Sequence, residues 1–107
     1  MSKFKLQPMK EVKIFVQGEQ LNHVTNLLDA VKTPGYTIVP TISDKGNHGV
    51  HVSNPMTNEL ENTVMLLTVV PEEQLEPIIA GIAPIFEKHA GAIFVFDTTV
   101  VKRDSGK

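Results

Sequence analysis

The fold is decided by residues 37–70, TIVPTI (37–42), SDKGNHGVHVSNPMTNELEN (43–62) and TVMLLTVV (63–70). The two outer segments are rich in apolar and β-branched side chains, which predicts a strand on each side. The middle segment contains glycines, asparagines, a proline and histidines without any apolar period, which predicts a loop. Loops longer than about 12 to 15 residues are uncommon in compact domains and usually carry a function or are disordered. Residues 43–62 are therefore the leading candidate for a functional segment.

Before this loop, the sequence predicts a strand, a helix and a second strand. Every second side chain of residues 11–17 is apolar, the alternation of a strand with one buried face. Residues 21–31 have apolar side chains at the three- and four-residue spacing of an amphipathic helix. The second strand is predicted over residues 36–42, and Pro40 favours a sheet edge because proline cannot donate a ladder hydrogen bond.

After the loop, the sequence predicts a strand, a helix and a last strand. Residues 63–70 are almost wholly apolar, which predicts a strand that is buried on both faces. The second helix begins at residues 71–73, where acidic side chains suit the positive end of the helix dipole. Gly91 is predicted to end it as a C-cap glycine, before a strand over residues 92–101. The predicted buried stripe of this helix is Leu75, Ile78, Ile79, Ile82, Ile85 and Phe86.

The order strand, helix, strand, strand, helix, strand is that of an α+β ferredoxin-like sandwich, βαββαβ. We expect one domain over residues 11–103, a polar tail over residues 1–10 and a second tail over residues 104–107. Both helices of such a sandwich cover one face of the sheet and leave the other open. The predicted strands place apolar side chains on both faces, so a single chain would expose a large apolar patch. We therefore expect the open face to pack against further copies of the chain.

Composition excludes several classes of protein. The chain has 107 residues, a formal net charge of −2 and no cysteine. It carries no basic field for nucleic acid, no apolar run long enough to span a bilayer, and neither a disulfide nor a thiolate metal site. We expect a cytoplasmic protein that neither binds nucleic acid nor inserts into a membrane.

Three short motifs resemble the PII signal-transduction family, whose members are trimeric ferredoxin-like proteins. They are GYTI at residues 35–38, VVPEE at 69–73 and IFVFD at 93–97, in place of the family's G-M-T-V, V-V-P-D-D and I-F-V-F-D. With the loop at the expected place, the resemblance covers most of residues 11–103. It implies a regulatory protein without enzymatic activity that binds adenine nucleotides between subunits and contacts a protein target through the loop at 43–62.

Departures from the family pattern indicate a particular branch. The family's glycine- and lysine-rich phosphate loop is reduced to HAGA at residues 89–92, and Ser105 stands where a second arginine would follow Arg103. A mono- or diphosphate is easier to hold with that charge than a triphosphate. The loop has no tyrosine for uridylylation, and Asn47 replaces a glutamine of the 2-oxoglutarate site. The GNHGVH sequence at residues 46–51 and the reduced phosphate loop are similar to the carboxysome-associated PII-like proteins, which implies ADP or AMP binding coupled to bicarbonate, in inorganic-carbon regulation.

The resemblance assigns two groups of ligand-binding residues and no cofactor. Bicarbonate is small and anionic, and backbone amides beside glycines can approach such an anion closely. The expected bicarbonate residues at the base of the loop are Ser43, Lys45, Gly46, Asn47 and Gly49. The expected nucleotide-binding residues are Gly35, Tyr36, Thr37, Val69, Gly91, Lys102 and Arg103.

Other functions of the same fold are weaker candidates. An acylphosphatase-like enzyme needs a phosphate-cradling loop with an arginine after the first strand, where this chain has QGEQ at residues 17–20. His48 and His51 could bind a metal, but no third or fourth ligand stands at a recognisable spacing, so we assign no metal site. A trimeric divalent-cation tolerance protein remains the alternative, since it shares the architecture.

Overall fold

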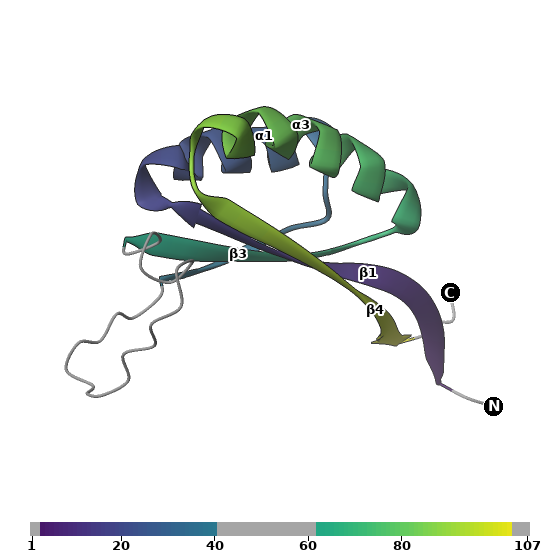
Figure 1. Cartoon of the computed structure of the whole chain (residues 1–107). Helices are drawn as coiled ribbons and strands as arrows, with labels where there is room; N and C mark the ends of the chain where they lie inside the picture. Colours follow the sequence, from purple (N-terminus) through teal and green to yellow (C-terminus); the bar gives the residue numbers. More distant parts are fainter. Residues whose placement is uncertain (1–2, 41–61, 104–107) are drawn as a thin grey trace.

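The computed structural model describes residues 3–40 and 62–103. In chain order it contains β1 (Phe4–Gln17), α1 (Leu21–Val31), β2 (Thr37–Pro40), β3 (Thr63–Val70), α3 (Leu75–Lys88) and β4 (Gly91–Arg103). Short 3₁₀ turns, Gly18–Gln20 and Glu72–Gln74, lead into the two helices. The element order confirms the predicted α+β ferredoxin-like arrangement (Figure 1).

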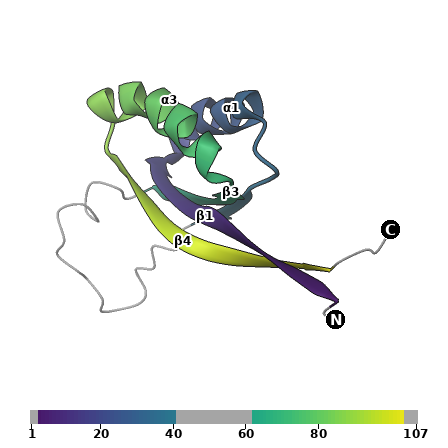
Figure 2. The same cartoon turned by 90° about the vertical axis from the view of Figure 1, so that its right-hand side faces the viewer.

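The strands form one antiparallel sheet in the order β2-β3-β1-β4. Both helices lie on the same face of this sheet, and the opposite face is not covered by any described element (Figures 1 and 2). Strand β2 pairs only with β3, which confirms the predicted edge position of Pro40. No helix within residues 3–40 or 62–103 combines the length and apolarity needed to cross a membrane.

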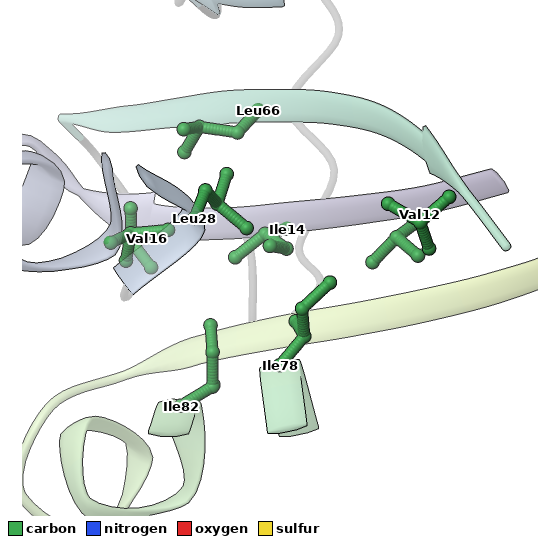
Figure 3. Packing of buried hydrophobic residues seen from close by; sticks show 9 residues of the cluster. Val12, Ile14, Val16, Leu28, Leu66, Ile78 and Ile82 are labelled. Carbon is green, nitrogen blue, oxygen red and sulfur yellow. The ribbon is translucent and has the colours of Figure 1, made fainter. Parts of the chain in front are cut away.

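The core lies between the helices and the covered face of the sheet. Alternate residues of β1 and β3 point into it, and side chains of α1 and α3 pack against them, as Leu28, Ile78 and Ile82 do in Figure 3. Its fully enclosed side chains are Val12, Ile14, Val16, Val24, Leu28, Leu66, Val70, Ile78 and Ile82, each at most 1% exposed. The predicted alternation of β1 and the predicted apolar face of α1 are thus confirmed.

The two helices approach closely at Gly81. A Cβ atom at this position would lie only 2.3 Å from the Leu27 side chain. Contacts between real Cβ atoms and their neighbours do not become that short, so even an alanine would force α1 and α3 apart or displace Leu27. Glycine at position 81 therefore lets the Leu27 side chain lie directly against α3.

The predicted tail over residues 1–10 is wrong, because β1 begins at Phe4. On the N-terminal side of Lys10, β1 does not pair with β3. This part of β1 pairs with β4 alone, from Met9 opposite Thr98 to Phe4 opposite Arg103. Pro8 lies in this two-stranded part, where one edge of β1 has no partner strand and a missing N–H is tolerated. We call this part, residues 4–9 with residues 98–103, the arm; it extends past the helices (Figure 1).

Three finer expectations also fail. Gly91 does not cap α3, which ends at Lys88 with His89 in extended geometry at its C-cap; Gly91 is the first residue of β4. Ile79 is 45% exposed, because it lies on the side of α3 that faces away from the sheet. Strand β3 is enclosed on one face only, since its other face, with Met65 and Leu67, is only half-buried.

Candidate functional site

The predicted nucleotide segment, residues 35–37, connects α1 to β2 and lies beside β3. The Thr68 hydroxyl donates a hydrogen bond of 2.6 Å to the Gly35 carbonyl, which ties the segment to the middle of the sheet. Tyr36 packs partly buried against the core, and Thr37 begins β2 opposite Leu67. Val69 lies two residues further along β3, so the structure places these four predicted residues in one neighbourhood.

Gln74 holds the same segment from its other end. Its Nε2 group donates to the Lys32 carbonyl at 3.3 Å and lies 3.5 Å from the Val31 carbonyl, at the C-terminal end of α1. Lys32 has a left-handed backbone, with φ of 67°, and starts the turn toward Gly35. The Oε1 atom of Gln74 is buried and has no hydrogen-bond partner in the described part of the chain. Gln74 therefore fixes where the turn leaves α1.

Thr68 and Gln74 were not predicted as site residues. Neither belongs to a ligand-binding pattern, since each supports the segment through its backbone. A signal for Thr68 exists in the sequence: it is the polar residue of β3 between apolar neighbours, at a position that alternation assigns to the covered face. A buried hydroxyl needs a partner, and that partner is the Gly35 carbonyl.

Gly91 lies in a different part of the molecule, at the start of β4. A Cβ atom at Gly91 would lie 2.3 Å from the Phe86 ring and 2.8 Å from the Phe15 carbonyl oxygen. The structure thus gives this glycine a packing role, in which it lets β4 pass between α3 and β1. Its expected role next to a phosphate stays a prediction.

Lys102 and Arg103 lie at the far end of β4, in the arm. Strand β4 contains 13 residues, which corresponds to about 40 Å between Gly91 and Arg103 at roughly 3.3 Å per residue. The two cations are consecutive on a strand, so they point to opposite faces. Lys102 lies opposite Lys5, and Arg103 lies opposite Phe4. One chain therefore does not bring the seven predicted nucleotide residues together.

The predicted bicarbonate residues, Ser43, Lys45, Gly46, Asn47 and Gly49, lie outside the described residues. The same holds for His48 and His51, the candidate metal ligands. Within residues 3–40 and 62–103, no group of three or more His, Cys, Asp or Glu side chains could hold a metal ion.

The open face of the sheet is apolar along its middle. The Phe15 and Phe94 rings meet edge to face, with centroids 5.8 Å apart and planes at 83°. The Lys13 ammonium lies 5.3 Å from the centroid of the Phe96 ring, a cation–π distance. Phe94 and Phe96 remain 44% and 47% exposed. Large aromatic side chains on an uncovered sheet indicate a contact surface.

Lys10 and Asp97 form an ion pair across β1 and β4, at the base of the arm. The hydrogen bond that the Lys10 ammonium donates to the Asp97 carboxylate raises the pKa of Lys10 above its usual value, although desolvation of the ammonium acts in the opposite direction. The Asp97 side chain is 86% exposed, so water screens this pair.

Comparisons with known proteins identify the family of the chain. The chain matches the family model described as nitrogen regulatory protein P-II over residues 9–105. A search of curated proteins returned no match.

Solved structures of CPII, a nitrogen regulatory PII-like protein from Thiomonas intermedia K12, are similar over nearly the whole chain. One, bound to ADP, AMP and bicarbonate, is 38% identical with a TM-score of 0.71 over 90% of this chain and 96% of that chain. Another, bound to ADP, AMP and acetate, is 36% identical with a TM-score of 0.70 over 90% of this chain and 91% of that chain. The apo form of CPII is 35% identical, with a TM-score of 0.75 over 92% of this chain and 98% of that chain.

Proposed function

The chain belongs to the nitrogen regulatory protein P-II family, and from that membership we propose that it is a sensor that binds ADP or AMP between subunits of a homotrimer. Members of this family are regulatory proteins and not enzymes. In this proposal bicarbonate is the second ligand, the loop at residues 43–62 orders on binding, and the ordered loop engages a protein target.

One observation carries the intersubunit site. Residues 35–37 and Val69 lie where the edge strand β2 begins beside β3, whereas Gly91 and the pair Lys102 and Arg103 lie at opposite ends of β4. Val69 is level with Glu11, and Arg103 with Phe4, which places them about 23 Å apart along β1 at roughly 3.3 Å per residue. A nucleoside diphosphate does not span these groups within one chain, so a site that uses all of them has to be assembled from more than one copy.

The open face supplies a surface for that assembly. Its exposed aromatic side chains, with Met65 and Leu67 beside them, would be covered when copies pack sheet to sheet. Burial of such side chains contributes about 25 cal/mol per Å² of apolar surface. A trimer at micromolar protein concentration is expected, and light scattering measures it; a monomer would contradict both the packing and the intersubunit site.

The ligands are proposed from the similar structures. Two of those CPII structures contain ADP and AMP, one together with bicarbonate and the other with acetate. Their 35–38% identity to this chain supports the same ligand classes here. A role in inorganic-carbon regulation is proposed from the bicarbonate in those structures, and a carboxysome association is proposed only from the resemblance of the sequence to the carboxysome-associated PII-like proteins.

Coupling between the two anions requires a cation between them. Two unit charges about 5 Å apart repel by about 3 kcal/mol at an effective dielectric near 20. We propose that Lys45, Lys102 or Arg103 offsets this repulsion. If both ligands order the same loop, the first to bind bears the entropy cost and the second binds more tightly, with a typical coupling of about 1 to 3 kcal/mol.

Calorimetry tests the proposal directly. ADP and AMP are titrated into the protein with and without saturating bicarbonate, and bicarbonate is expected to tighten ADP binding. Hydrogen exchange of residues 43–61 should slow in the presence of both ligands. An ADP affinity that bicarbonate leaves unchanged would refute the coupled sensor and leave a nucleotide-binding trimer.

The Arg103→Ala variant tests which phosphate group Arg103 contacts. Loss of Arg103 should weaken ADP more than AMP, because a charge-assisted contact to the distal phosphate exists only in ADP. In a Lys102→Ala, Arg103→Ala double variant, bicarbonate should no longer tighten ADP binding. Equal losses for ADP and AMP would place Arg103 away from the distal phosphate.

A further inference from the structure

The arm brings the chain's N-terminal residues against the end of β4 that carries Lys102. Lys5 and Lys102 are directly opposite each other in the antiparallel register, so their side chains share one face, with Cβ atoms about 4.5 to 5.5 Å apart. Both residues are exposed. The match to the family model begins at residue 9, so Lys5 belongs to a part of β1 that the family pattern does not include.

Like charges directly opposite each other on neighbouring strands destabilise a sheet. The arm contains three cations, Lys5, Lys102 and Arg103, and no acidic residue. Within the described residues neither lysine forms an ion pair, and the one ion pair near the arm, Lys10 with Asp97, lies at its base on the other face. The next acidic residue in the sequence, Asp104, lies outside the described residues. The arm therefore presents two adjacent positive charges without a described counter-charge.

We propose that Lys5 and Lys102 together bind the terminal phosphate of the nucleotide, so that Lys5 is a ligand-binding residue supplied by the N-terminal strand. This inference rests on the proposed function, because it names a further residue of the same site. A phosphate between the two ammonium groups converts their repulsion into two attractive contacts. Within one chain Lys5 is the cation that shares a face with Lys102. Arg103, on the opposite face of β4, would contact the distal phosphate independently of this pair.

The position of the arm also determines to which copy of the chain the lysine pair would contribute a ligand contact. Glu11 is the residue of β1 that is level with Val69. Lys5 lies six residues nearer the N-terminus of β1, which corresponds to about 20 Å. The lysine pair is thus remote from the adenine-binding residues of its own chain. It is placed to complete the site of a neighbouring copy, and the N-terminal strand positions Lys102 by pairing with it.

The test compares Lys5→Gln, which keeps the length of the side chain but removes its charge, with wild type by calorimetry. Lys5→Gln is expected to weaken ADP about threefold to tenfold and AMP less, and Lys5→Arg should restore the wild-type affinity. Lys88→Gln, which removes one exposed charge from the end of α3, is the matched control and should leave both affinities unchanged. Circular dichroism confirms that each variant is folded.

A second measurement uses pyrophosphate as the probe. Pyrophosphate should raise the melting temperature of wild type more than chloride does at equal ionic strength, and this difference should be smaller in Lys5→Gln. If wild type binds ADP but Lys5→Gln binds it equally well, the role of Lys5 is refuted and the proposed function stands. If wild type binds no ADP, the proposed function fails, and the pyrophosphate measurement still decides whether the lysine pair binds phosphate.

Discussion

The two faces of the sheet have similar apolar side chains and very different surroundings. On the covered face, Val12, Ile14 and Leu66 are at most 1% exposed, because α1 and α3 lie over them. On the open face, Phe94 and Phe96 keep 44% and 47% of their surface exposed. The covered face is completed by the chain itself and determines the fold. The open face is not needed for that core, and its apolar surface is what the proposed trimer would cover.

The largest expected effect is on the covered face. Leu66→Ala removes a fully enclosed side chain that lies opposite Ile14, and should lower the free energy of unfolding by about 2 to 5 kcal/mol. Urea unfolding measures this. The matched control is the next residue, Leu67→Ala, on the open face, whose effect should depend on protein concentration because it acts through assembly. Equal, concentration-independent losses would abolish the distinction between the faces.

The next effect concerns the open face alone. Phe94→Asp places a charge in the proposed interface and should weaken self-association more than tenfold, since a buried unpaired charge is strongly unfavourable. Light scattering gives the mass, and circular dichroism should show an intact fold. Val95→Asp is the control, because Val95 is 41% exposed and lies on the other face of the same strand. Dissociation by both variants would show that the open face has no special role.

A smaller effect is expected for Thr68, the residue of the covered face that holds residues 35–37 in place. Thr68→Val removes the hydrogen bond to the Gly35 carbonyl and leaves that carbonyl with one partner fewer. The free energy of unfolding should fall by about 1 kcal/mol. ADP binding should also weaken several-fold, because residues 35–37 lose their attachment to β3. Thr99→Val, an exposed threonine on β4, should change neither the stability nor the ADP affinity.

The smallest effect belongs to the exposed pair at the base of the arm. Asp97→Asn should lower stability slightly at pH 7. Because the pKa of Lys10 is raised in the folded chain, the pair stabilises it below the ordinary lysine pKa and loses this contribution as the pH rises through the raised value. Melting temperatures of wild type and variant should therefore converge above about pH 10.5. A difference that persists at high pH would assign the effect to packing.

Local patterns predicted the regular elements well. The alternation of β1, the helical spacing of residues 21–31 and the apolar run of β3 all follow from periodicity, and the structure has them. The first strand was missed before residue 11 because its partner is nearly a hundred positions away, and no local pattern signals that pairing. Pro8 does not exclude a strand here, because an edge without a partner strand tolerates proline. The position of Gly91 likewise depends on Phe86 and Phe15, which sequence spacing does not bring together.

Residues of the candidate site were predicted only where a motif names them. GYTI and VVPEE located residues 35–37 and Val69, which the structure places side by side. Thr68 and Gln74 were not predicted, because their side chains donate hydrogen bonds to backbone carbonyls. Such contacts form only when the elements are packed together. Lys5 escaped because its significance comes from the residue opposite it in the register.

The strand order has a consequence for how the chain folds during synthesis. Strand β1 is made before the other described elements, yet its two neighbours, β3 and β4, follow only after α1 and β2. Its ladder cannot be completed until Arg103 can meet Phe4. Pairings between positions so distant in sequence close slowly. Strand β1 therefore stays without a partner strand until β3 has been made, and α1, which forms from local contacts, is the first described element able to cover it.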